Sequence, residues 1–296
     1  MLNEAQDALG YYRRPGVMTS AGAQARHLDG LPADVGGLAG VVQGVLVHEH
    51  LTGWYGFELP DGRRDSVHLR PAEQLLERII TEDSRPLGVA RAAAERVAGN
   101  CRHFTVLTVT MLRAQGTPAR ARCGFGAYFV PGLFEDHWVC EFWDAARQRW
   151  VLADAQIDAL QRDRFGIGFD VLDVPRDQFL IAGDAWTRFR AGQADPGDFG
   201  LSVIGESGDW WIAANLMRDA AALCGMEMLP WDVWGAMPRP GDAMGPDLLA
   251  LFDRLAVLTT DPDASLEPLR AWYDRDDRLR VPPVVRNAQR GRDERV

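Results

Sequence analysis

The sequence predicts an α+β fold, because helical spacing of apolar residues gives way to strand-like alternation in mid-chain and then returns. Early in the chain apolar side chains recur every three or four positions, as in residues 71–80. Between residues 119 and 153 they alternate with polar ones and are punctuated by Pro and Gly. Helical spacing then resumes, most clearly over 215–223 and 248–258.

Four helices are expected before the strands. One is entered near residue 31 and runs to about His50, a second covers 71–80, and an Ala-rich third covers 86–98. The fourth follows Asn100, a favourable N-cap residue, and Gly116 ends it.

Three strand-like segments follow the fourth helix. Residues 119–129 contain two glycines, which are typical of a bulge or a close backbone approach. The next segment, 137–143, alternates, with one face formed by His137, Val139 and Glu141 and the other by Trp138, Cys140 and Phe142. After a turn at 144–147 the chain returns as a strand over 150–153.

These patterns divide the chain into four expected parts. Residues 1–30 form a loosely ordered arm, and residues 31–160 form the core with its N-terminal helices. Residues 161–273 form a mainly helical part packed on that core. Residues 274–296 are charged, contain Pro and have little to bury, so we expect a flexible tail.

Composition excludes several classes of function. A formal charge of -10 argues against nucleic acid or an anionic membrane as partner, because both need a basic surface. The first seven residues show neither a basic start nor an apolar stretch, so we expect no secretory signal and a cytoplasmic protein. The cysteines have wide spacing and no CxxC pair, which fits neither a disulfide framework nor a zinc module; they are Cys101, Cys123, Cys140 and Cys224.

A cysteine, a histidine and an aspartate occur in an order that builds a thiol nucleophile. Cys101 lies at a helix start, which favours thiolate, and His137 and Asp154 follow on successive strands. The imidazole can take or hold the proton, and the carboxylate can fix the imidazole. Each residue alone has an ordinary structural explanation in the core or at a strand end. Together, in this order and spacing, they indicate catalysis.

Four short motifs surround these residues. They are Gly-Asn-Cys-Arg-His-Phe at 99–104, Leu-Arg-Ala-Gln-Gly-Thr-Pro-Ala-Arg at 112–120, His-Trp-Val at 137–139 and Trp-Val-Leu-Ala-Asp at 150–154. In these motifs the chain resembles the core of the transglutaminase-like superfamily of papain-type cysteine enzymes. The resemblance implies a papain-like fold in which a nucleophile helix packs on an antiparallel sheet.

The resemblance also implies roles and a reaction. Cys101 would be the acyl-accepting nucleophile, His137 the general acid/base and Asp154 its orienter. A thiolate would attack an amide or ester carbonyl, and an amine or water would release the acyl group, without a cofactor. The expected substrate is a peptide, a protein side chain or a small-molecule amide.

Three alternatives remain open at this point. A cysteine peptidase or amidase would use the same residues but end the cycle with water. A non-catalytic binding or scaffold protein would retain the fold with an unreactive Cys101. A metal-dependent enzyme would use His48, His50 or His103, although histidines two positions apart on a helix diverge, so we expect no metal.

Four further residues are predicted to contact the substrate: Trp138, Asn100, His103 and Gln156. His103 has an alternative interpretation as a buried hydrogen-bonding residue, and Asp158 is a second candidate for the orienting carboxylate. The backbone N–H of Cys101 is the expected first oxyanion donor, because helix-start amides lack intrahelical partners. The second donor is open among Trp54, Tyr55 and Asn100. We expect Trp210 and Trp211 to pack against the catalytic layer or to cover its cleft.

Overall fold

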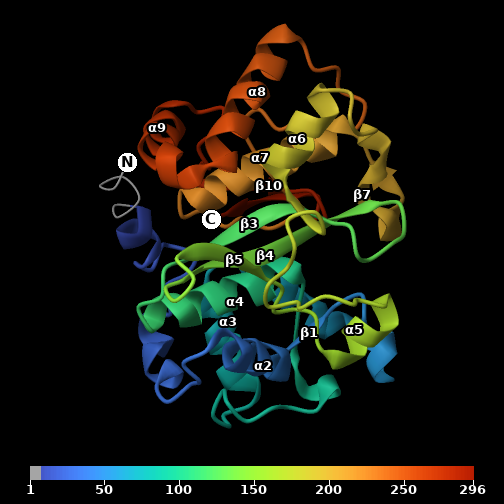
Figure 1. The fold of residues 1–296 in the computed structure, drawn as a ribbon. Helices are drawn as coiled ribbons and strands as arrows, with labels where there is room; N and C mark the ends of the chain where they lie inside the picture. The colour runs from blue at the N-terminus through green and yellow to red at the C-terminus, as the bar shows by residue number, and fades with distance from the viewer. Residues whose placement is uncertain (1–7) are drawn as a thin grey trace. The chain divides into compact units, whose positions relative to one another are not determined.

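The computed structural model describes residues 8–296, which form two compact units (Figure 1). Unit 1 comprises, of the described residues, 8–9, 122–138 and 175–296. Unit 2 comprises 10–121 and 139–174. Strands β3 (Ala119–Gly126) and β4 (Phe134–Asp144) contribute residues to both units.

The mixture of helices and sheets confirms the predicted α+β class. In the six-stranded sheet the order is β6-β3-β4-β7-β8, and β5 pairs with β4. The other strands are β5 (Arg149–Ala153), β6 (Phe179–Ile181), β7 (Phe199–Leu201) and β8 (Glu206–Ser207). β3 pairs antiparallel with β6, β4 antiparallel with β5, and β4 parallel with β7. The strands predicted over 119–129, 137–143 and 150–153 correspond to β3, β4 and β5.

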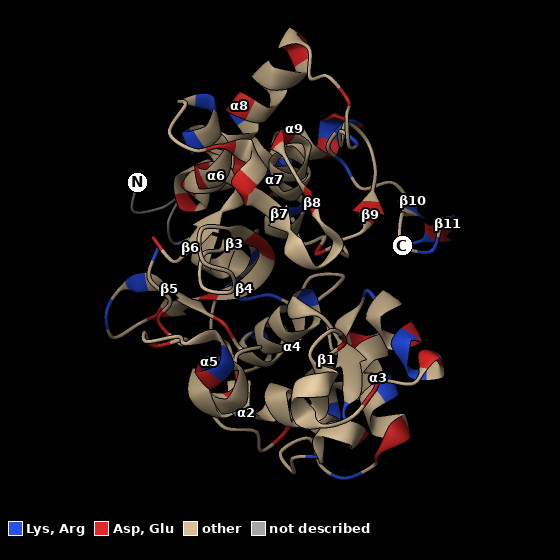
Figure 2. Ribbon diagram, turned by 90° about the vertical axis from the view of Figure 1, so that its right-hand side faces the viewer, with Lys and Arg blue, Asp and Glu red and all other residues tan. Residues whose placement is uncertain are grey.

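Unit 2 is organised around helix α4 (Cys101–Ala114). Every residue of α4 except Ala114 is buried, and the helix is mostly tan in Figure 2 because few of its residues are charged. Helices α2 (Val35–Val45) and α3 (Ala72–Glu82) both contact it. Other helical segments of this unit are α5 (Ala159–Phe165), η1 (Gly22–Leu28), η2 (Thr52–Tyr55), η3 (Asp61–His68) and η4 (Ala93–Glu95).

A short parallel strand pair replaces two stretches that were predicted as helix. The helix expected to reach His50 ends at Val45, and β1 (Leu46–His48) follows it. β1 pairs in parallel with β2 (Val97–Gly99), so the helix predicted over 86–98 is also wrong. Buried parallel strands read as continuous apolar runs, which periodicity does not separate from a buried helix.

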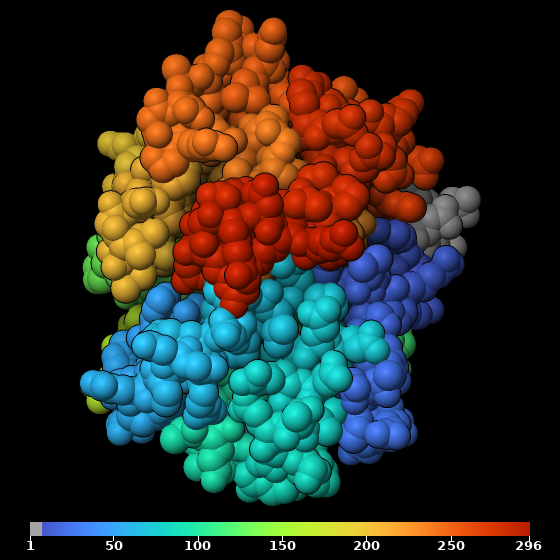
Figure 3. Space-filling view, turned by 180° about the vertical axis from the view of Figure 1, so that it is seen from behind, coloured from blue at the N-terminus to red at the C-terminus, as the bar shows by residue number. Residues whose placement is uncertain are grey.

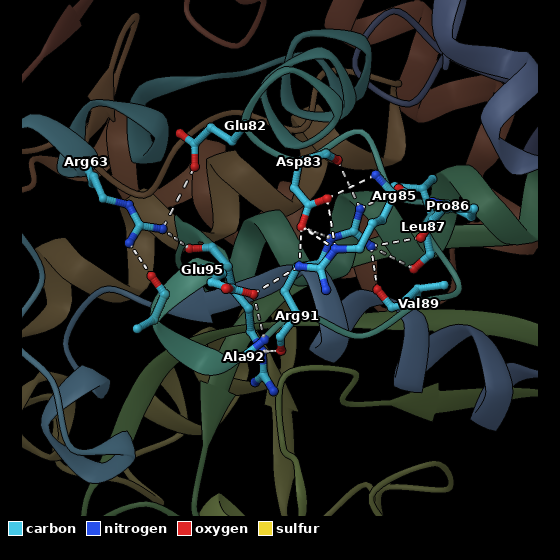
Figure 4. A network of polar contacts seen from close by, with 12 residues as sticks. Arg63, Glu82, Asp83, Arg85, Pro86, Leu87, Val89, Arg91, Ala92 and Glu95 are labelled. Atoms are coloured by element: carbon cyan, nitrogen blue, oxygen red, sulfur yellow. Dashed lines mark hydrogen bonds and ion pairs between the residues drawn. The ribbon is translucent and has the colours of Figure 1, made fainter.

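The chain before β2 wraps around the guanidinium group of Arg91 (Figure 4). Arg91 is buried, and its two Nη groups donate to backbone carbonyl oxygens at 2.6–3.1 Å; the acceptors are Asp83, Arg85, Pro86 and Val89. In a helix these carbonyls would accept backbone N–H groups instead. The guanidinium instead donates to these carbonyl oxygens in a loop, which is why the Ala-rich stretch after Pro86 does not form the expected α-helix.

Packed helices form much of the described part of unit 1. They are α6 (Ala182–Arg190), α7 (Asp209–Leu223), α8 (Pro246–Thr260) and α9 (Pro262–Arg275), and α8 contacts the other three. The helices predicted over 215–223 and 248–258 are confirmed as parts of α7 and α8. Short segments η5 (Pro196–Asp198) and η6 (Ser202–Ile204) precede α7.

The segment expected to be a flexible tail holds a β-hairpin instead. Strands β10 (Val284–Asn287) and β11 (Arg292–Arg295) pair antiparallel, and β10 also pairs with β9 (Asp232–Val233). Val285 and Asn287 are buried, and the C-terminal residues form part of the surface that is red in Figure 3. One of the two partners of β10, β9, lies some fifty positions earlier, and local composition does not reveal that pairing.

The predicted N-terminal arm is packed where the structure describes it. Residues 1–7 lie outside the described residues. Tyr12 and Met18 are buried, and η1 lies against α3. Among the helices of residues 8–296, none has both the length and the apolar composition needed to cross a membrane.

A buried ion pair anchors α7 to β3 within unit 1. Asp219 accepts from Arg122 Nε at 3.0 Å and Nη2 at 2.8 Å, and also from the backbone N–H of Cys123 at 2.9 Å. Arg122 Nη2 donates further to the carbonyl oxygen of Thr259 in α8 at 2.8 Å. One carboxylate and one guanidinium thereby connect β3, α7 and α8.

We expect Arg91→Lys to lower the free energy of unfolding by about 3 kcal/mol, because one ammonium group replaces only part of the donors that hold the loop. Urea unfolding of the purified chain measures the change. Arg85→Lys is the matched control: Arg85 belongs to the same network but is exposed, so its replacement should change stability far less. Equal losses in the two variants would contradict this account of the loop.

We expect Asp219→Asn to cost about 3–5 kcal/mol of unfolding free energy, because it removes the carboxylate that hydrogen-bonds the buried guanidinium of Arg122. Asp293→Asn removes an exposed partner of Arg286 and should change stability by less than about 1 kcal/mol. Denaturant titration of both variants tests the contrast. A small effect of Asp219→Asn would show that the pair is not an anchor.

Candidate active site

Cys101 is the first residue of α4, and a buried strand leads into it. β2 ends at Gly99, Asn100 occupies the N-cap position with extended backbone, and Cys101 follows. The cysteine is 8% exposed. The backbone N–H groups of a first helical turn have no intrahelical acceptor, so the thiol lies where unpaired amides concentrate positive potential.

His103 caps this helix with its ring. The backbone N–H of Asn100 donates to His103 Nδ1 at 3.2 Å, and the side-chain oxygen Oδ1 of Asn100 lies 2.9 Å from the same nitrogen. Nε2 lies 3.0 Å from the carbonyl oxygen of Leu69, which can only accept, so Nε2 carries the hydrogen. This is the reciprocal half of a capping box.

The environment of His103 keeps its ring neutral. The side chain is completely buried, and burial together with the neighbouring Arg102 charge lowers its pKa well below the ordinary value. With both ring nitrogens engaged inside the chain, the structure supports the buried hydrogen-bonding interpretation of His103.

Asp154 follows the last residue of β5 and begins a tightly held turn. Its backbone N–H donates to the carbonyl oxygen of Val171 at 2.7 Å, and its Oδ1 accepts from the N–H of Gln156 at 3.1 Å. Gln43 of α2 donates through Nε2 to the carbonyl oxygens of Ala155 and Ile157, both at 3.1 Å. The turn is thus fixed from both ends.

A chain of side-chain hydrogen bonds continues from this turn. Gln156 Nε2 donates to Gln161 Oε1 at 3.2 Å, and Gln161 Nε2 donates to the Tyr55 hydroxyl at 2.9 Å. That hydroxyl donates to Asp158 Oδ2 at 2.6 Å, while Asp158 Oδ1 accepts the N–H of Gln161 as the N-cap of α5. Both oxygens of Asp158 are therefore used, which weighs against it as the orienting carboxylate.

His137 lies in the part of β4 that belongs to unit 1. The imidazole is buried, and three aromatic rings surround it, those of Phe129, Tyr128 and Phe179 with centroids at 4.7, 6.0 and 6.3 Å. The adjacent Trp138 is completely buried, and its Nε1–H has no hydrogen-bond partner among the described residues.

The residue before His137 holds β4 to α7. Asp136 accepts from Trp211 Nε1 at 3.0 Å and from Asn215 Nδ2 at 3.1 Å, and burial raises the pKa of its carboxyl. The ring of Trp210 lies 4.8 Å from that of Trp211. Trp211 thus has a packing and hydrogen-bonding role within unit 1.

The structure groups the predicted site residues by unit. In unit 2, Asn100, Cys101 and His103 share the start of α4, and Asp154 and Gln156 share the turn after β5. His137 and Trp138 belong to unit 1. Of the open oxyanion candidates, the hydroxyl of Tyr55 is used in the chain above, and the ring of Trp54 packs on Phe165 at 4.8 Å.

Two residues that hold the turn after Asp154, Gln43 and Gln161, were not predicted from the sequence. Gln43 is 112 positions from Ala155, so no local pattern indicates the contact. The role of His103 had a visible signal, because a side-chain acceptor three positions after an N-cap residue is the spacing of a capping box.

The His48-Glu49-His50 segment lies at the end of β1 and not at a helix end as predicted. The N–H of Glu49 donates to the carbonyl oxygen of Gly99 at 2.9 Å. Residues 8–296 contain no group of three His, Cys, Asp or Glu side chains placed to hold a metal ion. Glu49 is 4% exposed, and burial, only partly offset by Arg64, raises its pKa to about 7.

A comparison with protein families places this region. The model of the transglutaminase-like superfamily matches residues 75–155. The resemblance inferred from the motifs is thereby confirmed for this stretch, and this transglutaminase-like region contains Cys101, His137 and Asp154. The match supports a cysteine-dependent enzyme as the general class.

Two further comparisons add little to the transglutaminase-like match. No curated protein matches the chain significantly. Among solved structures, the chain is similar to a putative cysteine protease from Cytophaga hutchinsonii, at 13% identity and a TM-score of 0.35. The likeness covers 58% of this chain and 45% of that protein, so the chain spans less than half of that protein's length.

We expect Glu49→Gln to stabilise the chain at high pH only. The folded pKa of about 7 exceeds the ordinary value of 4.5, so the folded state holds a proton that the unfolded state has lost. Stability therefore falls as the pH rises through this window, by about 3 kcal/mol in total. The variant should regain that amount above pH 7 and nothing below pH 4.5. Urea unfolding at pH 4.5 and 8 measures this, with the exposed Glu58→Gln as control; equal effects at both pH values would contradict it.

Proposed function

We propose that this protein is a cysteine-dependent acyl-transfer enzyme that attacks an amide carbonyl with a thiolate. Cys101 is the nucleophile, His137 the general acid/base and Asp154 the residue that orients the imidazole. The acyl group passes to an amine or to water. The proposal is supported chiefly by the position of Cys101, the first residue of a buried helix within the transglutaminase-like region.

The register of β4 and β5 gives further support. Cys140 pairs with Ala153, the residue just before Asp154, and His137 lies three positions before Cys140 on β4. In the alternation of β4, His137 and Val139 point to one face, and continuing the antiparallel register brings position 154 beside position 139. The carboxylate of Asp154 would then lie on the same face of the sheet as the imidazole of His137, where it can serve as the partner that orients the ring.

The chemistry follows from these roles. The thiolate of Cys101 attacks the carbonyl carbon, and the helix-start amides stabilise both the thiolate and the developing oxyanion. Imidazolium of His137 protonates the departing amine as the C–N bond breaks, which leaves a thioester. An incoming amine or water gives its proton to the imidazole, the C–S bond breaks, and the thiolate returns.

Transfer and hydrolysis differ only in the group that opens the thioester. Mass analysis of products with and without an added primary amine separates the two. The substrate classes that fit are a peptide, a protein side chain or a small-molecule amide. Trp138, with its buried unpartnered Nε1–H, and Asn100, next to the nucleophile, are proposed substrate contacts.

We expect iodoacetamide to alkylate Cys101 at pH 6 at least about 10-fold faster than the other cysteines, because only Cys101 is proposed to exist as a thiolate there. Burial raises the pKa of the Cys140 and Cys224 thiols, so these serve as internal controls. Peptide mass spectrometry reads each site. His137→Ala should abolish the fast labelling of Cys101 at pH 6 and leave the labelling of Cys224 unchanged.

Two results would count against the proposal. If Cys101 labels no faster than the half-buried Cys224, the thiol is not activated, and a scaffold that keeps the fold is the better description. If labelling is fast but survives His137→Ala, another group activates the thiol. Loss of acyl transfer by roughly 10³-fold in Cys101→Ser would complete the positive case.

A further inference from the structure

Gln156 presents a buried acceptor that no described residue uses. The side chain is 3% exposed, and its Oε1 has no hydrogen-bond partner among residues 8–296. A buried amide oxygen left without a donor costs free energy of the order of a lost hydrogen bond. Such a group is retained where a bound molecule supplies the donor.

The hydrogen-bond chain fixes which end of the Gln156 amide is presented. Asp158 accepts only, because its carboxylate takes the Tyr55 hydroxyl hydrogen at 2.6 Å. Tyr55 can then only accept from Gln161, whose oxygen consequently faces Gln156. The nitrogen of Gln156 is thus committed to Gln161, and the oxygen is the end that remains.

The backbone around Gln156 is held as firmly as its side chain. Its N–H donates to Asp154, and Gln43 binds the carbonyl oxygens of Ala155 and Ile157 on either side. The acceptor is therefore preorganised two residues after the carboxylate proposed to orient His137. Preorganised groups of this kind set specificity, because they do not reorganise when the ligand binds.

We propose that Gln156 Oε1 accepts a hydrogen bond from the N–H of the amide that the enzyme breaks or forms, and so selects amides that carry an N–H. This inference rests on the proposed function. It commits the site to unsubstituted and singly substituted amides and to primary amines, and it disfavours tertiary amides and secondary amines.

The selectivity follows from counting hydrogens in the transfer step. When a primary amine attacks the thioester on Cys101, the C–N bond forms and the C–S bond breaks. One amine hydrogen goes as a proton to the imidazole of His137, and the second remains on nitrogen to donate to Gln156. A secondary amine has only the first hydrogen, so Gln156 would stay without a donor.

The experiment measures how an acetyl-enzyme divides between two amines. p-Nitrophenyl acetate acetylates Cys101, and propylamine or N-methylpropylamine then competes with water for the acetyl group. Mass spectrometry gives the ratio of N-propylacetamide to N-methyl-N-propylacetamide. We expect Gln156→Met to lower that ratio about 10-fold, because the intrinsic reactivities of the amines are the same in both proteins.

Two further variants sharpen the test. Tyr55→Phe should also lower the ratio, but by less. Without the Tyr55 hydroxyl the side-chain amide of Gln161 is no longer held in one orientation, whereas the acceptor on Gln156 is still present. Gln115→Met is the matched control: Gln115 donates to Pro32 at an exposed position of unit 2, and its loss should leave the ratio unchanged.

The outcomes separate this inference from the proposed function. An unchanged ratio in Gln156→Met, or an equal loss with both amines, overturns the role of Gln156 while acetylation of Cys101 continues. If the wild-type protein shows no burst of p-nitrophenolate that depends on Cys101, the proposed function fails and this role fails with it.

Discussion

The sheet depends on the burial of two arginines on one face of β3, two positions apart. Arg120 donates through Nε to Glu141 at 2.6 Å in unit 2, and its guanidinium lies over the ring of Trp150 at 3.8 Å. Arg122 is paired with Asp219 in unit 1. A buried guanidinium without a counter-charge is strongly destabilising. The element that packs against each of these arginines must therefore supply a carboxylate. The neighbours of β3 are therefore selected by charge as well as by apolar fit.

The same rule, that buried polar groups must be paired, shapes the start of α4. The ring of His103 accepts the Asn100 N–H, and its other nitrogen is bound at the carbonyl oxygen of Leu69, so a single side chain joins β2 to α4. In the same way, the side chain of Gln43 donates to two backbone carbonyl oxygens in the turn after Asp154 and so ties this turn to α2. Groups that stabilise the fold thus surround Cys101 and Asp154, whereas Gln156 Oε1 is a buried acceptor without a partner among the described residues.

The motifs made the central part of the fold predictable. Asn100 before an apolar helical run located α4, and the alternation after residue 119 located β3, β4 and β5. Prediction failed where one distant partner decides the local structure. The loop around Arg91 replaces an expected helix because a side chain binds its carbonyls, and β10 joins the distant β9 to the hairpin that it forms with β11. The candidate nucleophile, base and orienting carboxylate could be proposed from the sequence, because a Cys, a His and an Asp follow one another in the expected order. The contacts of Gln43 and Gln161 could not, because they depend on packing between segments that are far apart in the chain.

The electrostatics of unit 2 bear on which imidazole can serve Cys101. His103 is only two residues away in sequence, yet burial and Arg102 depress its pKa, and both of its nitrogens are already bound. It can neither take up a second proton near neutral pH nor rotate to the thiol without breaking the cap of α4. A nucleophile at Cys101 therefore needs an imidazole from another element. His137, which lies beside the rings of Phe129, Tyr128 and Phe179, is the candidate that the proposed chemistry requires. Its removal, more than that of His103, should therefore remove thiol reactivity at low pH.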